Sequence, residues 1–393
     1  MSLPLPRSIS HLVRPLRSVL MAGALVSLSL AGHAGAVQAA TDSDHDGLSN
    51  VFERTYGLNP NSKDSNHDGL RDGAEDPDGD GLSNLGEQRF GTNPLKADTN
   101  GNGTSDWSED SNHDGIPDGL EQDRRPVPSN LTPSLSKAAT DQPQSYRDGC
   151  HSGPMEAAIH PCAYGALHGS ITVAIFGDSH MAQWLPALTK AGSSHGWKII
   201  SITKSACPSV TVQFQEPVFP GAEASCNTWR SRAGAWLQAH PPTLIIVANS
   251  HKYRLIDGSG NRIPKPDVEQ AWDTGLGTTL DALPTASHRL VLGDTPFMSA
   301  DVPACIAKNR SNVSACEKSR AQGLDPAHDA AETSVAESHA ATFASLSTKV
   351  CSYDPCPAVV NELLVYRNES HITATYAKQL WPSMAKVVTQ ALP

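Results

Sequence analysis

Short apolar runs alternate with amphipathic stretches through the C-terminal part of the chain. Runs rich in β-branched residues predict buried strands, and apolar residues at helical spacing predict helices between them. Such alternation is typical of an α/β fold with a parallel sheet covered on both faces. The expected strands are 171–176, 198–203, 243–248 and 289–293, with a fifth near 348–351. The expected helices are 182–191, 228–239, 268–283, 327–345 and 373–390.

The N-terminal residues follow a different pattern. Three arginines precede an apolar run over residues 19–31, and small residues follow up to Ala40. This order predicts a secretory signal peptide over residues 1–40, and an uncleaved signal anchor is the alternative. The run is short for a membrane span. We therefore expect an exported protein, either periplasmic or extracellular and at the cell surface.

Polar residues dominate the segment after this leader, and its charge is uneven. Between Asp42 and Asp123 the sequence has 20 Asp and Glu residues against 5 Lys and Arg residues, whereas the whole chain carries a net charge of −11. Such dense negative charge favours divalent cations. It argues against nucleic acid as a partner, because phosphates need a basic surface.

Carboxylate and amide side chains recur in this segment at the spacing of calcium loops. A twelve-residue loop offers oxygens from positions 1, 3, 5, 7, 9 and 12, and Gly at position 6 allows a sharp turn. The pattern occurs five times, with Gly at each sixth position. The predicted metal ligands are Asp42, Asp44, Asp46, Asn50 and Glu53; Asp64, Asn66, Asp68, Asp72 and Glu75; Asp76, Asp78, Asp80, Asn84 and Glu87; Asp98, Asn100, Asn102, Asp106 and Glu109; and Asp110, Asn112, Asp114, Asp118 and Glu121.

The loops repeat with a period of 34 residues, from Asp42 to Asp76 and from Asp64 to Asp98. No amphipathic helix of normal length separates them, so they are not EF-hands. Residues 42–121 resemble the thrombospondin type 3 repeats of bacterial surface proteins. The resemblance implies a calcium-bound rod, placed at 41–121, with little regular secondary structure. A Pro-, Ser- and Thr-rich stretch over 122–149 predicts a flexible linker.

The chain has 8 cysteines, which fits an oxidising compartment. They lie as four close pairs along the chain, and nearby cysteines close loops most readily. We therefore expect sequential pairing, although eight cysteines allow 105 connectivities. The expected pairs are Cys150 with Cys162, Cys207 with Cys226, Cys305 with Cys316, and Cys351 with Cys356.

Candidate catalytic residues follow the predicted strand ends, where ligands bind in parallel sheets. Ser179 comes directly after the first strand, on a sharp turn before a helix. His371 lies just ahead of the last helix, so the two side chains form a candidate acyl-transfer dyad. The alternative for Ser179 is a helix cap. We expect Asp178 to brace the turn through hydrogen bonds.

Six phrases along residues 150–393 resemble the SGNH domain that many bacteria fuse to a membrane acyltransferase-3 domain. They are Gly177-Asp178-Ser179-His180, Lys204-Ser205-Ala206-Cys207-Pro208, Cys226-Asn227-Thr228-Trp229, Leu292-Gly293-Asp294-Thr295-Pro296, Val302-Pro303-Ala304-Cys305 and residues 366–374. The resemblance implies a flavodoxin-like α/β/α sandwich, Ser179 as nucleophile and His371 as general base. Asn249 is a candidate oxyanion donor or, alternatively, a satisfied strand-end amide. The family's second-block glycine has no counterpart near Ser205.

The terminal motif departs from the family at one position. The family has Asp three residues before the His, and here this position is Asn368. Three alternatives are open: Glu369 supplies the carboxylate, a backbone carbonyl orients His371, or the site is weakened. His180 and His251 lie at the same strand ends, and they are pocket-lining or surface residues, or else alternative bases.

The resemblance implies an acyl-ester enzyme that acts on envelope or extracellular glycans. Transfer of an acetyl group to a sugar and hydrolysis of an acetyl ester share an acyl-serine intermediate, and both are open. Because the printed sequence holds no membrane acyltransferase domain, we expect a separate membrane acyltransferase as partner, or an esterase. The alternative from another class is a non-catalytic, calcium-dependent surface or glycan-binding module.

Overall fold

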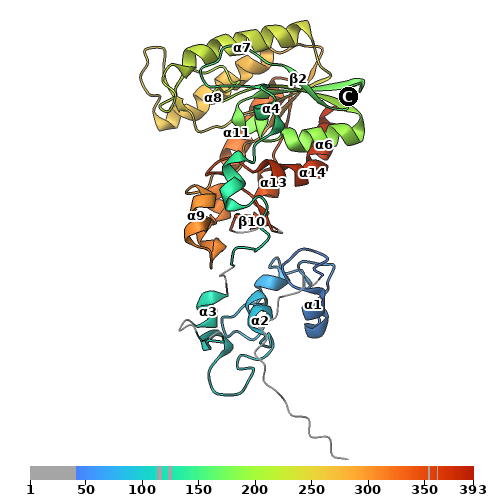
Figure 1. Ribbon diagram of the computed structural model, residues 1–393, viewed down its shortest axis with the longest axis vertical. Coiled ribbons are helices and arrows are strands. Elements are labelled where there is room, and N and C mark those ends of the chain that lie inside the picture. The colour runs from blue at the N-terminus through green and yellow to red at the C-terminus, as the bar shows by residue number, and fades with distance from the viewer. Residues whose placement is uncertain (1–40, 112, 114–116, 123–125, 353–354, 361) are drawn as a thin grey trace, which may run out of the picture.

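The computed structural model describes residues 41–111, 113, 117–122, 126–352, 355–360 and 362–393. The predicted signal peptide lies outside the described residues, as do Asn112 and Asp114 of the fifth predicted calcium loop. Within the described ranges, no helix is long and apolar enough to cross a membrane. Figure 1 shows the acidic N-terminal segment as a small body beneath a larger α/β domain.

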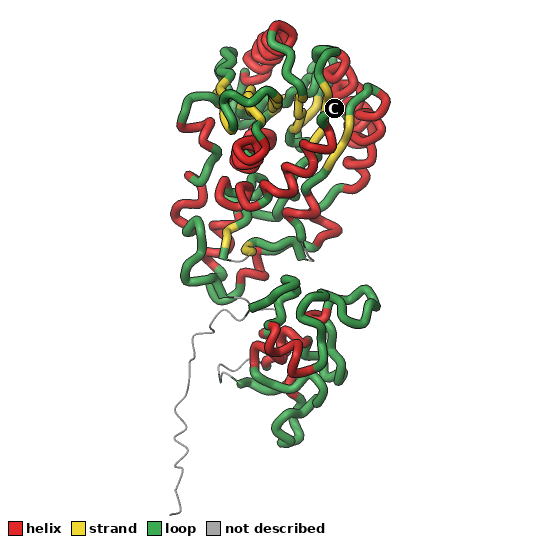
Figure 2. The backbone as a smooth tube through the Cα atoms, turned by 90° about the vertical axis from the view of Figure 1, so that its right-hand side faces the viewer, coloured by secondary structure: helices red, strands yellow, loops and turns green. Residues whose placement is uncertain are grey.

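Loops make up most of the N-terminal body, as Figure 2 shows in green. Gln88 and Gln122 hold successive repeats in the same way. The Gln88 side chain accepts from the Ser49 N–H and donates to the Gly47 carbonyl, and Gln122 repeats both bonds with Ser83 and Gly81. The predicted period of 34 residues therefore recurs in three dimensions. The helical pieces are α1 (Asn50–Tyr56), η1 (Asp72–Ala74), α2 (Asn84–Phe90), η2 (Asp106–Ser108) and α3 (Asp118–Glu121).

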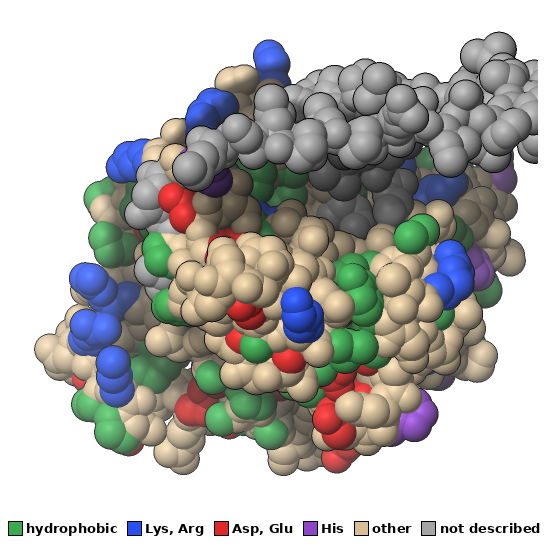
Figure 3. Space-filling model, turned by 90° about the horizontal axis from the view of Figure 1, so that it is seen from below, with side chains coloured by type: hydrophobic (Ala, Val, Ile, Leu, Met, Phe, Trp, Pro, Cys, Tyr) green, Lys and Arg blue, Asp and Glu red, His purple; other side chains and the backbone are tan. Residues whose placement is uncertain are grey.

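Asp and Glu side chains (red) are visible across the face of this body in Figure 3. Its apolar core is small, and Leu48 and Leu82 are its fully buried leucines. A body with so little apolar burial needs another source of stability.

The α/β domain is built on a seven-stranded, mostly parallel sheet with the order β1-β4-β3-β6-β8-β9. The short strand β2 pairs antiparallel with β4. The five strands β4-β3-β6-β8-β9 follow the order 2-1-3-4-5 of a flavodoxin-like sheet, which confirms the predicted fold. The strands are β1 (His151–Ser152), β2 (Cys162–Gly165), β3 (Ile171–Gly177), β4 (Trp197–Lys204), β6 (Leu244–Ala248), β8 (His288–Leu292) and β9 (Thr342–Ala344).

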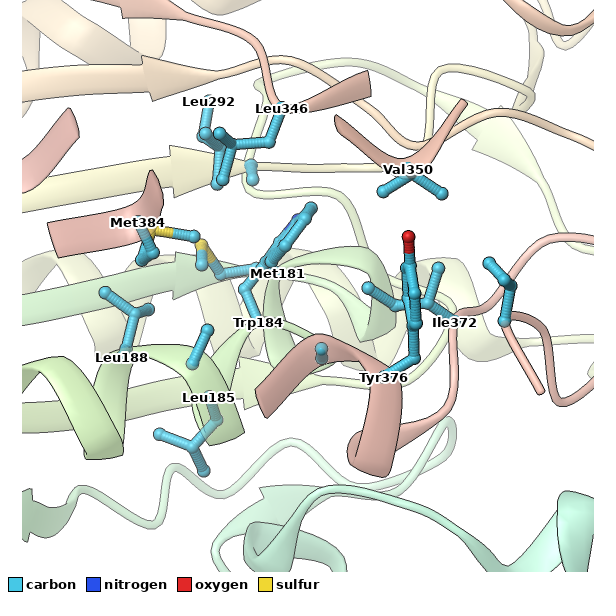
Figure 4. Packing of buried hydrophobic residues seen from close by; sticks show 14 of the residues in the cluster. Met181, Trp184, Leu185, Leu188, Leu292, Leu346, Val350, Ile372, Tyr376 and Met384 are labelled. Atoms are coloured by element: carbon cyan, nitrogen blue, oxygen red, sulfur yellow. The ribbon is translucent and has the colours of Figure 1, made fainter. Parts of the chain in front are cut away.

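Helices cover both faces of the sheet and bury one apolar cluster on each. Figure 4 shows the cluster that includes Met181, Trp184 and Met384, which pack between the sheet and the helices of one face. That face carries α5 (Ser179–Ala182), α6 (Leu185–His195), α9 (Val302–Lys308), α13 (Ala374–Gln379) and α14 (Trp381–Ala391). The other carries α7 (Ala222–Ala239), α8 (Lys265–Asp281) and α11 (Pro326–Ser338).

Smaller elements complete the domain. Two short antiparallel pairs join β5 with β7 and β10 with β11. The remaining elements are η3 (Leu135–Thr140), α4 (Gln144–Arg147), β5 (Phe214–Gln215), β7 (Arg254–Leu255), η4 (Val313–Cys316), α10 (Arg320–Gly323), α12 (Ser347–Val350), β10 (Val359–Val360) and β11 (Leu363–Leu364).

Four of the five predicted strands are confirmed, and the fifth is wrong. The last strand is β9, whereas the segment near 348–351 lies in helix α12. The helix predicted over 327–345 ends early, because Ala340 turns the chain with a φ of 53° before β9 begins. The helix predicted over 373–390 is two helices, and Pro382 stands in the first turn of the second, where a proline is tolerated.

The segment predicted as a flexible linker, 122–149, is largely packed against the α/β domain. Leu131 and Ala138 are buried in one of its apolar clusters. The Thr132 N–H donates to the Glu362 carbonyl, and the Thr132 carbonyl accepts from the Leu364 N–H. These contacts correct the prediction: apolar residues between the polar ones anchor the segment from Val127 onward.

The four disulfides pair sequentially, as predicted: Cys150 with Cys162, Cys207 with Cys226, Cys305 with Cys316, and Cys351 with Cys356. All four lie within the α/β domain.

Candidate active site and calcium loops

Carboxylates converge in the first and third predicted calcium loops. Each loop brings its first three aspartates together, with one oxygen of each within 4.8 Å of the others. A second trio includes the terminal glutamate and a carboxylate of the following loop, Asp72 or Asp106. The trios are Asp42, Asp44 and Asp46; Asp46, Glu53 and Asp72; Asp76, Asp78 and Asp80; and Asp80, Glu87 and Asp106.

Oxygens in these trios lack protein partners. Both carboxylate oxygens of Glu53 and one each of Asp44, Asp46 and Asp78 are buried without a hydrogen bond in the described part of the chain. Burial and the neighbouring aspartates raise the pKa of Glu53 to about 7. Burying carboxylates without a partner costs free energy unless a cation neutralises them. The hard oxygen donors fit calcium, so these side chains could hold it.

The second and fourth loops differ, because asparagines occupy positions that are aspartates in the first and third. The Asn66 amide donates to Glu75 over 2.6 Å, and the Asn100 amide donates to Glu109 over 2.5 Å. Asp98, Asp106 and Glu109 still form one carboxylate trio in the fourth loop. Within the described residues, Asp64, Asp68 and Asp110 join no such trio. The Glu121 side chain lies outside the description.

The ninth positions, predicted as ligands, also brace their loops. Asp72 accepts from the Ser65 N–H over 2.7 Å and from its hydroxyl over 2.6 Å. Asp106 and Asp118 accept the same two bonds from the second residue of their loops. Asn50 accepts the N–H bond, and Asn84 donates to the Asp72 carbonyl.

The candidate active site lies where three neighbouring strands end. Gly177 at the end of β3 is in register with Thr203 of β4 on one side and Ala248 of β6 on the other. The residues that follow, Ser179, Ser205 and Asn249, therefore lie at one edge of the sheet. Gly177 is required for this close fit, since a Cβ there would lie 1.9 Å from the Ala248 carbonyl oxygen.

Ser179 and His371 are hydrogen-bonded to each other. Ser179 begins α5, and its Oγ lies 2.8 Å from the Nε2 atom of His371. The loop before α13 carries His371, and the Gln183 side chain fixes this loop by accepting the Ile372 N–H over 2.9 Å. A serine hydroxyl bonded to an imidazole is the arrangement of a nucleophile and its general base.

Asn368 orients the His371 ring. Its Oδ1 accepts the backbone N–H groups of Ser370 and His371 over 2.9 and 2.7 Å. The amide also faces His371 Nδ1, with Oδ1 at 3.2 Å and Nδ2 at 3.1 Å, and the Ser370 hydroxyl lies 3.3 Å from the same nitrogen. Neither Glu369 nor a backbone carbonyl is among the partners of Nδ1 in the described part. The ring is held, but by a neutral group.

Asp178 braces the turn that presents Ser179, as expected. The carboxylate is fully buried and accepts from the His180 N–H, the Ser250 N–H and the Tyr253 hydroxyl over 2.7, 2.9 and 2.8 Å. It therefore ties the turn after β3 to the loop after β6. Burial raises the pKa of Asp178 above its ordinary value.

Asp294 is bonded to both His180 and His251, a role that could not be predicted from the sequence. Its oxygens lie 2.6 Å from His180 Nδ1 and 2.9 Å from His251 Nδ1. The His180 ring lies 4.6 Å from the His371 ring, while neither His180 nor His251 is bonded to Ser179 in the described chain. Burial opposes the charge on His180, and Asp294 overcomes it and raises the pKa of His180. Asp294 is thus connected to His371 through the His180 ring.

His371 has a low proton affinity. Burial, followed by the charges of His180 and Arg367, holds the pKa of His371 well below its ordinary value. The ring is therefore neutral at neutral pH, the form that can accept a proton from Ser179.

The family comparison decides what this site is. A model of the SGNH domain fused to AT3 domains matches residues 149–386, more than half of the chain. The chain belongs to the SGNH family. As a member it is an SGNH-type acyltransferase or O-acetylesterase. A model of the bacterial TSP3 repeat matches residues 42–63 and 76–97, and the first and third calcium loops fall in these two ranges.

Solved structures resemble the SGNH domain at low identity. The periplasmic domain of a lipopolysaccharide acetyltransferase from Salmonella ser. Paratyphi A is 15% identical, covers 66% of this chain and 98% of its own, and has a TM-score of 0.48. Est24, a carbohydrate acetylesterase from Sinorhizobium meliloti, is 15% identical over 56% of this chain and 99% of its own, with a TM-score of 0.35. An aryl esterase from M. smegmatis is 15% identical over 57% and 100%, also at 0.35. No curated protein matches the chain.

Donors that could face an oxyanion surround Ser179 in this SGNH domain. Asn249 is buried, and its Oδ1 accepts from the Ser209 N–H and hydroxyl over 2.7 and 3.0 Å. This leaves its NH₂ group without a partner among the described residues. Ala206, after β4, has a φ of 50°, a left-handed conformation that favours glycine. The missing second-block glycine therefore has a conformational counterpart in Ala206, which a search for glycine could not find.

Proposed function

We propose that this chain is an exported serine acyl-ester enzyme that transfers acetyl groups to, or removes them from, envelope or extracellular glycans. The observation that carries the proposal is the 2.8 Å bond between Ser179 Oγ and His371 Nε2 at the strand ends of an SGNH domain. Ser179 is the nucleophile, and His371 is its general base.

The reaction has two halves. His371 Nε2 takes the proton of Ser179 as Oγ attacks the ester carbonyl carbon, and the carbonyl electron pair moves to oxygen. The alcohol then leaves with the proton from His371, and an acyl-serine remains. Water or a sugar hydroxyl attacks next, gives its proton to His371 and releases the acyl group from Ser179, whose Oγ regains the proton.

Three groups would stabilise the oxyanion of each half. They are the backbone N–H of Ser179 at the first position of α5, the backbone N–H of Ala206 and the Asn249 NH₂ group. The α5 N–H has no partner within its own helix, because the first turn of a helix leaves such groups free. Removing one donor of this kind from an acyl-transfer enzyme costs about 10² to 10³ in turnover.

Calcium is proposed as a structural ion of the N-terminal segment. Asp42, Asp44, Asp46, Glu53 and Asp72 would hold it at the first loop, and Asp76, Asp78, Asp80, Glu87 and Asp106 at the third. When bound, calcium supplies positive charge to carboxylates that otherwise repel one another. Its role is to stiffen the N-terminal segment as a spacer.

A separate membrane acyltransferase is the proposed source of acyl groups for transfer.

Hydrolysis of p-nitrophenyl acetate tests the enzymatic proposal. We expect the mature chain to release p-nitrophenol, and Ser179→Ala and His371→Ala to lower the rate by about 10³ or more. Ser193→Ala, at the exposed end of α6, is the matched control and should keep wild-type turnover. Equal rates in wild type and Ser179→Ala would refute the Ser179 mechanism and favour the non-catalytic binding module.

A further inference from the structure

Arg367 is a buried cation beside the base of the proposed reaction. The residue is 8% exposed, and its Nε atom is buried without a hydrogen-bond partner. Its backbone N–H donates to the His371 carbonyl over 2.9 Å. Among the described residues, no Asp or Glu forms an ion pair with it. Arginine is rarely buried without an anionic partner, because removing its charge from water costs free energy.

Aromatic rings locate the guanidinium on the β4 side of Ser179. Its Cζ lies 5.7 Å from the centroid of the Tyr146 ring, so the guanidinium packs against this ring. Tyr146 stacks on His151 at 4.1 Å between ring centroids. His151 Nε2 lies 2.9 Å from the Ser205 hydroxyl, directly after β4. Arg367, Tyr146 and His151 therefore form one cluster that flanks the catalytic pair.

The other groups of this cluster do not neutralise Arg367. Burial, then Arg367 itself, lowers the pKa of His151 to about 3, so that ring is neutral at neutral pH. Lys204, the nearby cation, donates to the carbonyls of Gly153 and Pro154 over 2.5 and 2.8 Å. Tyr146 and His151 therefore leave the positive charge of Arg367 unbalanced.

Other inward-facing arginines of the domain have structural acceptors for their terminal nitrogens, although the Nε atom of Arg289 is also buried without a partner. Arg289 donates to the carbonyls of Leu283, Pro284 and His339, and Arg230 donates to those of Val210 and Val212. Within the described chain, the Arg367 side chain has no carbonyl acceptor of this kind. Bracing the fold therefore does not account for its position.

We propose that Arg367, packed against Tyr146, binds the carboxylate of an acidic sugar next to the ester that Ser179 attacks. His151 supports the Tyr146 ring, and its own ring nitrogens are already bonded to Thr203 and Ser205. The inference rests on the proposed function and narrows its substrates to glycans that contain uronic or related acidic sugars. A planar guanidinium matches a carboxylate through two parallel hydrogen bonds. A single guanidinium balances the single charge of a carboxylate, which favours this anion over a phosphate.

Paired substrates test the subsite in the full mature chain. O-acetylated methyl galacturonide and O-acetylated methyl galactoside differ in one carboxylate, and acetate release is measured for both. We expect wild type to prefer the acidic ester about tenfold or more in kcat/KM, mostly through KM, since a lost bond to a charged group costs about that much. Arg367→Gln should remove the preference, and Arg367→Lys should restore part of it.

Arg232→Gln is the matched control, because Arg232 is an exposed arginine on α7. It should keep the wild-type preference. Equal kcat/KM on both esters in wild type, or an equal loss on both in Arg367→Gln, would overturn the subsite. Competition by inorganic phosphate that exceeds competition by galacturonate would overturn the carboxylate assignment.

Direct binding separates this inference from the proposed function. Calorimetry of wild type with methyl galacturonide and methyl galactoside needs no turnover, and it also decides the matter if the Arg367 variants fail to fold. Tighter binding of galacturonide without any Ser179-dependent hydrolysis would retain the subsite and refute the enzyme. Ser179-dependent hydrolysis with equal binding of both sugars would retain the enzyme and refute the subsite.

Discussion

A neutral amide holds His371, the proposed general base, where the SGNH family has a carboxylate. Asn368 keeps the geometry, because Oδ1 caps two backbone N–H groups and the amide faces His371 Nδ1. It does not supply the negative charge that stabilises an imidazolium. In a serine protease the corresponding Asp→Asn change costs about 10⁴ in turnover.

Replacement Asn368→Asp should raise turnover of p-nitrophenyl acetate by about tenfold or more. The carboxylate would keep both backbone bonds and accept the proton of His371 Nδ1. Stopped-flow measurement of acylation compares Asn368→Asp with wild type. Asn249→Asp, which makes the same amide-to-carboxylate change at another residue of the site, is measured beside it. An unchanged or lower rate in Asn368→Asp would mean that Asp294 or another group already supplies the charge.

Activity should persist at mildly acidic pH. Burial, His180 and Arg367 lower the pKa of His371, so the neutral ring that accepts a proton survives below the ordinary histidine value. We expect kcat/KM to stay level from about pH 8 to pH 6 and to fall only as the pH drops through the lowered pKa. Asn368→Asp should move this acid limb to higher pH. A wild-type midpoint near the ordinary histidine pKa would contradict the account.

Some residues of the candidate site could be predicted from the sequence, and others could not. Ser179 and His371 could be found because each stands in a distinctive phrase. Ala206 could not, since only its φ reveals the turn that replaces a glycine. Arg367 stands inside the terminal motif, but the sequence does not show that its charge has no anionic partner. This is seen only in the folded chain, where Tyr146, from a segment predicted to be a linker, packs against the guanidinium.

At the scale of elements, one buried carboxylate connects the ends of β3 and β6. Asp178 satisfies three donors from α5 and the loop after β6, and that junction determines where Ser179 points. The loop after β4 is fixed separately, by the disulfide between Cys207 and Cys226.

Asp178→Ala should destabilise the domain by about 3 kcal/mol, because three buried donors would lose their acceptor. Urea unfolding measures the free-energy change, and p-nitrophenyl acetate turnover should fall with it. Asp257→Ala, in the exposed turn after β7, is the control and should change the free energy of unfolding little. A loss below about 1 kcal/mol would show that the turn is held by its neighbours.

The elements near the sheet centre could be predicted, and those at its margin could not. Strands β3 and β6 are almost continuous apolar runs, and β4 and β8 contain shorter apolar runs, so their sequences predict their conformation. β9 has three residues and is specified by its pairing with β8. The packed segment after Val127 was mistaken for a linker because its few apolar residues, such as Leu131, are spaced among prolines and serines.

At the scale of the whole molecule, two bodies depend on different forces. The SGNH domain has two apolar clusters and four disulfides, whereas the N-terminal body has few buried apolar side chains and many unpaired carboxylates. We therefore expect calcium to stabilise the N-terminal body and to leave the stability of the SGNH domain unchanged.

Chelation should make the N-terminal body sensitive to protease while esterase turnover stays within about twofold. Limited proteolysis with mass spectrometry locates the cuts between residues 42 and 121. Glu53→Gln should weaken protection at the first loop and leave the third unchanged. A turnover loss of about tenfold in chelator would show that the two bodies are coupled.

Ser179 is proposed to carry the acyl group, and the resulting acyl-serine can be trapped. Wild-type protein is mixed with p-nitrophenyl acetate, quenched in acid during the first turnovers, and mapped by peptide mass spectrometry. We expect the added mass of one acetyl group on the peptide that contains Ser179, and its loss in Ser179→Ala together with turnover. Turnover that continues in Ser179→Ala, or an acetyl group found only on another residue, would show that Ser179 is not the nucleophile.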